Sequence, residues 1–431
     1  MIDINKIYVW IIITALILII PGIHYITYLD ELCAMAFFGV AVLDAAVNHA
    51  WRKYRLLWLI TAIIGAYTIY SIVLLSNNTP PYIMMDWIIE IKPFVPFAVL
   101  LCAGIRFTRI EKTIIEKICI INCTIISLLM MASIAYFGKY IIDITVQHIS
   151  YCGHIIFLCM MLYLFCKIDR NGSIDRSALF TTITFLTLGL LCTRSKYYAV
   201  YICAIPFLLY YRPGITRHLT IKHLIAIGLI GILVITVTWT KFNFYFMGGA
   251  DFSNINPAEI EAFARPVLYA TSFMIFVDYF PFGSGLASFA SFPSAASYSN
   301  IYYEYGINNV WGLSPSMPDF ICDAYYPSLA QFGIIGVILF IWFWIYAYSF
   351  IRIQIRNFLP QYKYNIIIGS LCIIFILVES TTGTTFTFTT GLLVMALLGI
   401  ASYPGYEMKL SADTHRNDKS LCIPLTDYKI Q

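Results

Sequence analysis

Charged residues are scarce in this sequence. Asp, Glu, Lys and Arg make up 12% of the 431 residues, against about a quarter in an ordinary soluble domain, and hydrophobic residues make up 60%. This balance excludes a soluble globular protein. The net charge of +4 does not indicate a nucleic-acid-binding face either, because the basic residues lie in short connections between apolar runs.

Cysteine motifs are also absent. The sequence has twelve Cys but no CxxC pair, and most of them lie inside apolar runs, where a thiol behaves as a small hydrophobe. We therefore expect no disulfide framework, no metal site and no cofactor. A cleavable signal peptide is not evident, since Lys6 precedes "IYVWIIITALILII", which is typical of a first spanning helix that remains as an anchor.

The sequence does contain many apolar runs of about 17 to 25 residues, the length that a helix needs to cross a hydrocarbon core of roughly 30 Å. Backbone amides have no water partners there, so each run should be helical. We predict an all-α integral membrane protein with about twelve transmembrane helices. They are expected near residues 6–24, 31–50, 56–76, 81–104, 114–136, 150–167, 177–193, 196–211, 220–240, 326–350, 364–382 and 387–403.

One long interruption divides these helices. Residues 241–325 are polar and rich in Tyr, and we expect one large loop there with a short amphipathic helix. Helices 1 to 9 then occupy 1–240, and helices 10 to 12 occupy 326–403. The remaining residues, 404–431, should form a polar and flexible tail.

The distribution of Lys and Arg predicts which side the loop faces. These residues favour cytoplasmic connections. With the N-terminus inside, every inner connection carries basic residues, and all but six of the 27 Lys and Arg lie on the inner side. The six exceptions are Lys92, Lys139, Arg194, Lys196, Lys241 and Arg265. We therefore predict that both termini are cytoplasmic and that the loop is extracytoplasmic.

The first candidate cluster is the outer turn within "LLCTRSKYYAV". Thr193, Arg194, Ser195 and Lys196 lie there between two apolar runs with almost no loop. Two cations and two hydroxyls between helix ends could bind an anion, and diphosphate is the obvious anion at a membrane face. A tight hydrophilic turn would have the same composition.

The second cluster is "FARPVLYATSFMIFVDYFPFGSGLASF" at 263–289. Arg265 opens an amphipathic segment, Pro281 ends it, and Gly283 and Gly285 allow a tight backbone turn. The guanidinium and the amides of the turn could both meet phosphate oxygens. A helix that lies on the membrane surface explains the same pattern.

The third cluster is "PDFICDAYYPSLAQFGIIG" at 318–336. Asp319 and Asp323 would stand one helical turn apart if this segment is helical, and Tyr325 and Tyr326 follow closely. Paired carboxylates can act as a general base, but they can also pair with the outer cations. The Tyr rings suit sugar rings and the membrane interface equally well.

The order of these three clusters resembles the O-antigen polymerase and O-antigen ligase superfamily. The resemblance covers about 193–345 together with helix number and topology; the individual motifs are degenerate, and their order and spacing carry it. It implies a metal-independent glycosyltransferase with a fold related to other integral-membrane glycosyltransferases. Its substrates would be undecaprenyl-diphosphate-linked oligosaccharides at the periplasmic face of the bacterial inner membrane.

The resemblance also implies roles for particular residues. The donor diphosphate would be held by the basic residue of the first turn and the Arg of the second segment, here Lys196 and Arg265. The family usually has Arg at the first position, so a point charge replaces a bidentate donor. Arg194 could supply that donor, and the sequence leaves open which of the two faces the site.

The remaining roles concern the acceptor sugar. Asp323, with Asp319 beside it, is expected to position the acceptor hydroxyl or to take its proton. Tyr325 and Tyr326 are expected to contact sugar. Polymer length regulation usually needs a separate partner, which the resemblance suggests.

The sequence favours a polymerase over a ligase. Ligases of this superfamily carry a His just before the Asp-x-Tyr run, where this chain has Cys322, and 241–325 contains no His. His24, His148 and His154 lie near other outer ends, where we expect interfacial or interhelical hydrogen bonds. A polymerase would join lipid-linked repeat units into O-antigen, capsular or exopolysaccharide, and a ligase that transfers glycan to a lipid A-core acceptor is the alternative.

A flippase or other transporter is the second alternative. Transporters place ionisable residues within the membrane and often contain repeats. The candidates here are Asp44, Asp86, Glu90 and Lys92, and we expect the last two to pair locally beside "PFVP". The halves of the sequence show no repeat, and a flippase has little need of so long a loop.

Overall fold

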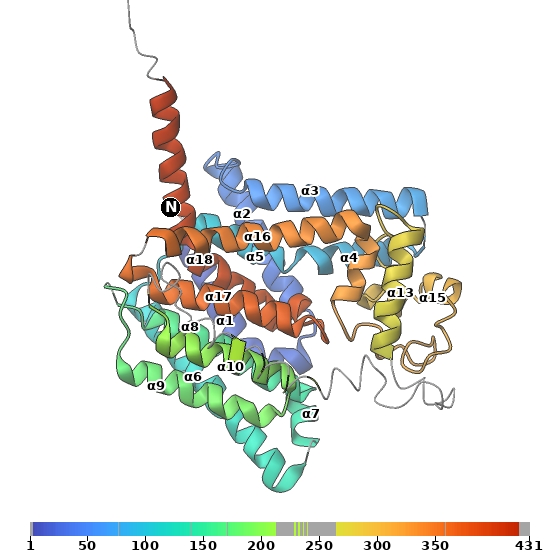
Figure 1. The fold of residues 1–431 in the computed structure, drawn as a ribbon, viewed down its shortest axis with the longest axis horizontal. Coiled ribbons are helices and arrows are strands. Elements are labelled where there is room, and N and C mark those ends of the chain that lie inside the picture. Colours follow the sequence, from blue (N-terminus) through green and yellow to red (C-terminus); the bar gives the residue numbers. More distant parts are fainter. Residues whose placement is uncertain are drawn as a thin grey trace, which may run out of the picture.

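The computed structural model describes residues 3–421, except positions 76, 139, 170 and 358 and all but a few positions of 213–263. In this part of the chain the regular elements are helices and no strand is present. Figure 1 shows long helices side by side, with a smaller unit that carries α13 and α15 at one end. The α-helices that the described residues form are α1 (Ile4–Tyr25), α2 (Leu29–Val47), α3 (Arg55–Tyr70), α4 (Pro80–Ile91), α5 (Phe94–Ala103), α6 (Arg109–Ala132), α7 (Tyr140–Val146), α8 (Ile149–Cys166), α9 (Arg176–Leu188), α10 (Ser195–Tyr210), α13 (Ala264–Asp278), α14 (Phe292–Ala296), α15 (Ile301–Glu304), α16 (Gly333–Asn357), α17 (Lys363–Glu379) and α18 (Thr389–Leu421).

Seven helical segments of the described chain are long and apolar enough to cross a membrane. They are Ile4–Gly22, Arg55–Leu75, Arg109–Tyr136, Ile149–Cys166, Tyr326–Asn357, Pro360–Glu379 and Thr389–Ser411. The predicted all-helical class and the presence of membrane-spanning helices are thus supported. The number twelve stays a prediction, and the helix expected over 220–240 falls almost entirely outside the described residues.

The helices differ in how much of their surface other helices cover. In α8 and α18, 78% and 83% of the residues in the apolar window are buried, against 28% in the segment Tyr326–Asn357. α8 and α18 therefore form the core, and α16 is a peripheral helix with exposed Ile and Trp side chains. An apolar surface of this kind is stable against lipid but not against water.

The helix expected over 81–104 is two helices, α4 and α5. They separate at Lys92 and Pro93 because Pro has no amide hydrogen to continue the helix. Lys92 does not pair with Glu90, so the expected local pair is wrong. Its Nζ contacts Asp30 at 2.6 Å and also Glu31, both at the start of α2, while Glu90 accepts a hydrogen bond from Tyr325.

Residues 264–325 form a folded unit. Its core is built from side chains that α13, α15 and the turns between and after them contribute, among them Leu268, Ile275, Phe289, Tyr302 and Ile321. α13 begins at Ala264 and ends at Asp278, within the segment where the sequence predicts a short helix. Its exposed side carries the apolar side chains of Phe273, Met274 and Val277, so its amphipathic character stays a prediction. α13 packs on the 3-10 helix Tyr326–Phe332, which leads into α16.

The two ends of the helices gather different connections. At one end, the Asn77 and Asn78 side chains donate to carbonyls of Ser284 and Ala287 in the 264–325 unit. At another, the Asn5 side chain and the Arg106 backbone exchange two hydrogen bonds. At each end, the connections that contact one another are ones that the distribution of Lys and Arg assigns to the same side of the membrane. Which side is cytoplasmic stays a prediction.

The last helix is longer than expected, and the flexibility of the tail stays a prediction. α18 continues through Pro404 to Leu421, well beyond the expected end at 403. Tyr406 holds the extension against α16, because its ring lies 5.7 Å from that of Phe350. Residues 422–431 lie outside the described part.

Candidate functional site

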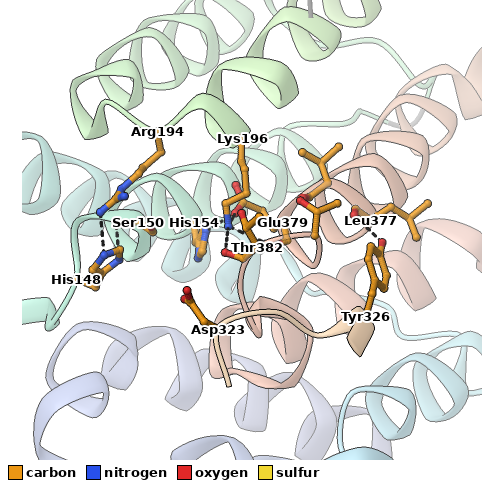
Figure 2. A network of polar contacts seen from close by, with 12 residues as sticks. His148, Ser150, His154, Arg194, Lys196, Asp323, Tyr326, Leu377, Glu379 and Thr382 are labelled. Atoms are coloured by element: carbon orange, nitrogen blue, oxygen red, sulfur yellow. Dashed lines mark hydrogen bonds and ion pairs between the residues drawn. The ribbon is translucent and has the colours of Figure 1, made fainter. Parts of the chain in front are cut away.

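The predicted basic turn is a sharp reversal between α9 and α10. A 3-10 turn, Gly189–Cys192, ends α9, and Thr193 adopts a left-handed conformation with φ of 51°. α10 then begins at Ser195. The reversal sends the side chains of Arg194 and Lys196 to different neighbours, as Figure 2 shows.

Lys196 is fully engaged by the end of α17. Its Nζ lies 2.8 Å from the Glu379 carboxylate and donates to the carbonyl oxygens of Glu379 and Thr382 at 3.2 and 3.0 Å. An ammonium has three hydrogens, so these contacts use all of them. Glu379 is 1% exposed and also lies 3.0 Å from Nε2 of His154 on α8.

Arg194 is only partly engaged. One Nη lies 2.8 Å from Nε2 of His148, whose Nδ1 lies 3.3 Å from the backbone nitrogen of Ser150 at the start of α8. A guanidinium only donates, so Nε2 of His148 accepts this hydrogen bond. The buried Nε of Arg194 has no hydrogen-bond partner within the described chain. Of the two basic residues in the turn, Arg194 is the one with a donor left over.

Arg265 and Asp323 form an ion pair between α13 and the turn before α16. The guanidinium lies 2.5 Å from the carboxylate, and the two side chains are 21% and 25% exposed. The charges of Arg265, Lys196 and Arg194 all act on Asp323. Burial raises the pKa of the Asp323 carboxyl above its ordinary value, and this effect exceeds the opposite effect of the cations.

The three predicted cations and Asp323 therefore meet in one place, although they lie up to 129 positions apart. Figure 2 shows the Asp323 carboxylate turned toward the side from which Arg194 and Lys196 approach. We call Arg194, Lys196, Arg265 and Asp323 the basic cluster.

Asp319 does not form the expected carboxylate pair. Residues 318–323 form turns and not a helix, so the expected helical spacing to Asp323 is wrong. Asp319 is exposed and has no hydrogen bond or ion pair to the described residues. The partner of Asp323 is Arg265.

Both predicted sugar-binding Tyr residues use their hydroxyl groups within the protein. Tyr325 is buried and donates to Glu90 at 3.1 Å, and half-buried Tyr326 donates to the Leu377 carbonyl at 2.6 Å. The ring of Tyr325 also lines a cavity of about 410 Å³. Sugar binding by these residues stays a prediction.

The glycine turn at 283–285 does not offer amides to an anion, so that expectation is wrong. The backbone N–H groups of Gly283, Ser284 and Gly285 donate to carbonyl oxygens of Tyr279, Ala330 and Gln331. The next two, of Leu286 and Ala287, donate to the side chains of Ser71 and Asp86. The turn therefore packs the 264–325 unit against the membrane helices.

Sequence reasoning missed Glu379, His148 and His154 as members of this site. The sequence does indicate Glu379, because it is a lone carboxylate at the end of an apolar run. An ionisable residue in a membrane segment is costly and therefore points to a functional site. The expected interhelical hydrogen bonding is confirmed for His154. His148 and His154 nevertheless bring imidazole to the basic cluster, so the lack of His in 241–325 does not make the site free of histidine.

Comparison with known proteins gives no assignment for this chain. Within the described residues, no group of three or more His, Cys, Asp or Glu side chains is placed to hold a metal ion. No family model matches the sequence, and no curated protein matches it.

Proposed function

We propose that this protein is a glycosyltransferase that polymerises undecaprenyl-diphosphate-linked oligosaccharide repeat units. The observation that supports this proposal is the basic cluster. Three cations from two distant segments meet two carboxylates, Asp323 and Glu379, at an end of apolar helices, beside a cavity large enough for sugar. Structural ion pairs alone need no such excess of positive charge around a partly exposed carboxylate.

The chemistry divides between the cations and the carboxylate. An acceptor hydroxyl attacks the anomeric carbon of the donor sugar, a new C–O bond forms, and the bond to the diphosphate oxygen breaks with its electron pair. Arg265 and Arg194 stabilise the departing negative charge, while Lys196, held by Glu379, keeps a fixed positive charge nearby. When diphosphate takes the Arg265 guanidinium, Asp323 is released from its ion pair and accepts the hydroxyl proton.

The proposal includes a membrane arrangement. About twelve helices span the bacterial inner membrane, both termini are cytoplasmic, and 241–325 lies on the periplasmic side with the basic cluster. Lipid-linked oligosaccharide is the substrate, and a chain-length regulator is a proposed partner. The product is O-antigen, capsular or exopolysaccharide.

The test is polymerisation by the purified full-length protein in lipid nanodiscs with undecaprenyl-diphosphate-linked repeat units. Products are separated by gel electrophoresis and sized by mass spectrometry. The wild type should form a ladder, and Arg265→Ala should form at least a hundredfold less. Arg356→Ala is the matched control, because Arg356 is exposed at the far end of α16. A normal ladder from Arg265→Ala would overturn the assignment.

A ligase is the second candidate, and the contact between His148 and Arg194 favours it. Imidazole beside a diphosphate site could handle an acceptor hydroxyl. A deletion strain discriminates between the candidates. Loss of a ligase removes single and multiple repeats from the final lipid anchor, loss of a polymerase leaves one repeat attached, and loss of a flippase traps repeats on the inner face.

A further inference from the structure

α13 lies across the ends of two spanning helices and does not run along them. Figure 1 shows α13 transverse to α3 and α16. It contacts α16 and the 3-10 helix Tyr326–Phe332 that precedes α16. A helix that crosses the ends of spanning helices lies parallel to the membrane plane, at the level where the hydrocarbon core meets the headgroups.

α13 has two apolar faces. One face, which includes Leu268 and Ile275, is buried in the core of the 264–325 unit. The other face carries Phe273, Met274 and Val277, whose spacing of three and four residues places them on one side of the helix. These three side chains are 67%, 53% and 75% exposed. An ordinary surface helix has polar side chains on its outward face, and a helix that is apolar on both faces needs a cover on each of them.

The two charged residues of α13 are engaged within the protein. They are Arg265 and Asp278. Arg265 pairs with Asp323, and Asp278 accepts a hydrogen bond at 2.8 Å from the hydroxyl of Tyr305, directly after α15. The outward face therefore presents neither a charge nor a strong hydrogen-bonding group, and contact with water does not stabilise it.

The outward face continues into the apolar surface of the spanning helices. Phe280 and Phe282 follow α13 and are exposed, and the ring of Phe282 lies 5.8 Å from that of Tyr70 on α3. Just after Tyr70, the exposed side chains of Val73 and Leu74 end a segment long enough to span the membrane. The continuous apolar surface beside α3 is a set that we call the α13 patch: Phe273, Met274, Val277, Phe280 and Phe282.

Lipid suits the α13 patch better than a second protein does. Contacts between helices in a membrane are rich in Gly, Ala, Ser and Thr, because small side chains let two backbones approach closely. The α13 patch has three Phe, a Met and a Val instead. Protein interfaces also have a polar rim, whereas this patch adjoins the exposed apolar side chains of a spanning segment.

We propose that the α13 patch is inserted into the adjacent leaflet of the bilayer and anchors the 264–325 unit there. α13 then lies between the core of this unit and lipid, so the unit is not a loop surrounded by water. Arg265 belongs to the first turn of α13, and the anchor therefore also holds the basic cluster at the depth of the headgroups. The anchor does not depend on the proposed transfer reaction.

Photolabelling of the full-length protein in phosphatidylcholine nanodiscs tests the anchor. Two phosphatidylcholine probes carry a diazirine, one near the glycerol and the other near the end of the acyl chain. Light releases N₂ from the diazirine and leaves a carbene, which inserts into the nearest C–H bond. Mass spectrometry after proteolysis then locates the adducts.

The probe near the glycerol should label the α13 patch as strongly as it labels Ile338 near the start of α16. The probe near the chain end should label Ile345 in the middle of α16 but not the patch. Glu304 and Asn309, exposed polar side chains of the same unit, should carry about tenfold fewer adducts than the patch. An unlabelled patch beside a labelled Ile338 would overturn the proposal. If native mass spectrometry then shows a dimer, a second copy covers the patch.

A variant tests whether these side chains hold α13 in the lipid. Phe273→Gln combined with Val277→Gln should lower the adducts on the retained Phe280 and Phe282 about threefold, because polar side chains favour water over the leaflet. Both positions are exposed, so the core of the unit is unchanged. Tyr303→Gln changes a similarly exposed ring on α15 and should leave the adducts as they are. Equal labelling of the double variant and the wild type would refute the anchor.

Discussion

At the residue scale, each cation of the basic cluster is held in a different way. Lys196 is locked by Glu379 and two carbonyl oxygens, and Arg265 is paired with a partly exposed carboxylate. Arg194 has a buried Nε without a hydrogen-bond partner among the described residues. A guanidinium with a donor to spare can meet a phosphate oxygen at low cost, whereas Lys196 would first have to leave Glu379. Arg194 is thus better placed than Lys196 to donate a hydrogen bond to a diphosphate.

Glu379 should be more important to stability than a surface ion-pair residue. In Glu379→Gln, Lys196 loses its countercharge in a buried position, and removing one partner of a buried pair costs roughly 3–5 kcal/mol. Glu116→Gln breaks the more exposed pair with Lys167 and should cost about 1 kcal/mol or less. Thermal unfolding in detergent compares the two. Equal melting temperatures would show that Lys196 does not need Glu379.

The pH dependence of transfer should report Asp323. Its pKa is raised by burial above the ordinary value of about 3.9, so activity should rise with pH as the carboxylate forms at a pH above that value. Asp323→Asn should lower the rate by about 10²–10⁴ and remove this limb of the profile. The rate of ladder formation across pH 4 to 8 checks both. A normal ladder from Asp323→Asn would exclude it as the base.

The raised pKa of Asp323 also makes the stability of the protein depend on pH. Folding favours the protonated form of Asp323, so its contribution to stability is complete below the unfolded pKa and is lost as pH rises through the folded one. Asp323→Asn should therefore become relatively more stable than the wild type as pH increases through that range. Chemical unfolding at several pH values measures this difference.

The residues of the site were only partly predictable. Arg194, Lys196, Arg265 and Asp323 stand out in the sequence because they are charges next to apolar runs on the side with few cations. Their contacts were not predictable, since Glu379 approaches Lys196 from a helix 183 positions away. Periodicity within a segment carries no information about which distant segment packs on it.

At the element scale, two glycines allow the 264–325 unit to meet α16. Gly283 has φ of 83° and Gly333 has φ of 62°. A Cβ at Gly283 would lie 2.2 Å from the backbone nitrogen of Gly333, and a Cβ at Gly333 would lie 2.4 Å from that of Gly283. The crossing needs glycine at both positions because backbone approaches backbone.

Gly283→Ala should therefore destabilise the protein strongly. It adds the left-handed backbone cost of about 1 kcal/mol and a collision with the α16 backbone that no side-chain rotation relieves, for at least about 2 kcal/mol in total. Gly306→Ala is the control, because Gly306 has φ of 66° but open space around its Cα. The difference between the melting temperatures of the two variants measures the effect of the collision alone, because both variants carry the cost of the left-handed backbone. Equal losses would show that the crossing can relax.

Most helices could be predicted from the sequence, but the close contact between Gly283 and Gly333 could not. Apolar runs long enough to span a membrane indicate α1, α6 and α8 directly, and α6 begins with a capping box of Thr108 and Glu111. A Gly-x-Gly pattern, in contrast, suits an anion-binding turn and a close backbone contact alike. The contact that decides between them involves Gly333, fifty positions away.

At the scale of the whole molecule, the connections sort into two groups by their charge. Lys and Arg are frequent in the connections beside Asn5 and Arg106, whereas the connections around the cavity contribute mainly Thr, Ser, Tyr and carboxylates. A chain that alternates across a membrane must bring its odd and even connections to opposite faces. Such an alternation would produce the observed grouping, and the excess of Lys and Arg predicts which face is cytoplasmic.

Cysteine labelling tests this orientation on intact cells. Asn309 is exposed in the 264–325 unit, and Gln361 is exposed between α16 and α17. In Asn309→Cys, a membrane-impermeant maleimide that passes the outer membrane should label the thiol in intact cells. In Gln361→Cys it should react only after the inner membrane is opened, because this connection faces the cytoplasm in the predicted topology. The unaltered chain measures the background labelling of its native Cys.

If Gln361→Cys is labelled in intact cells and Asn309→Cys is not, the chain is inverted. The basic cluster would then face the cytoplasm, where polymerisation of flipped lipid-linked repeats does not take place.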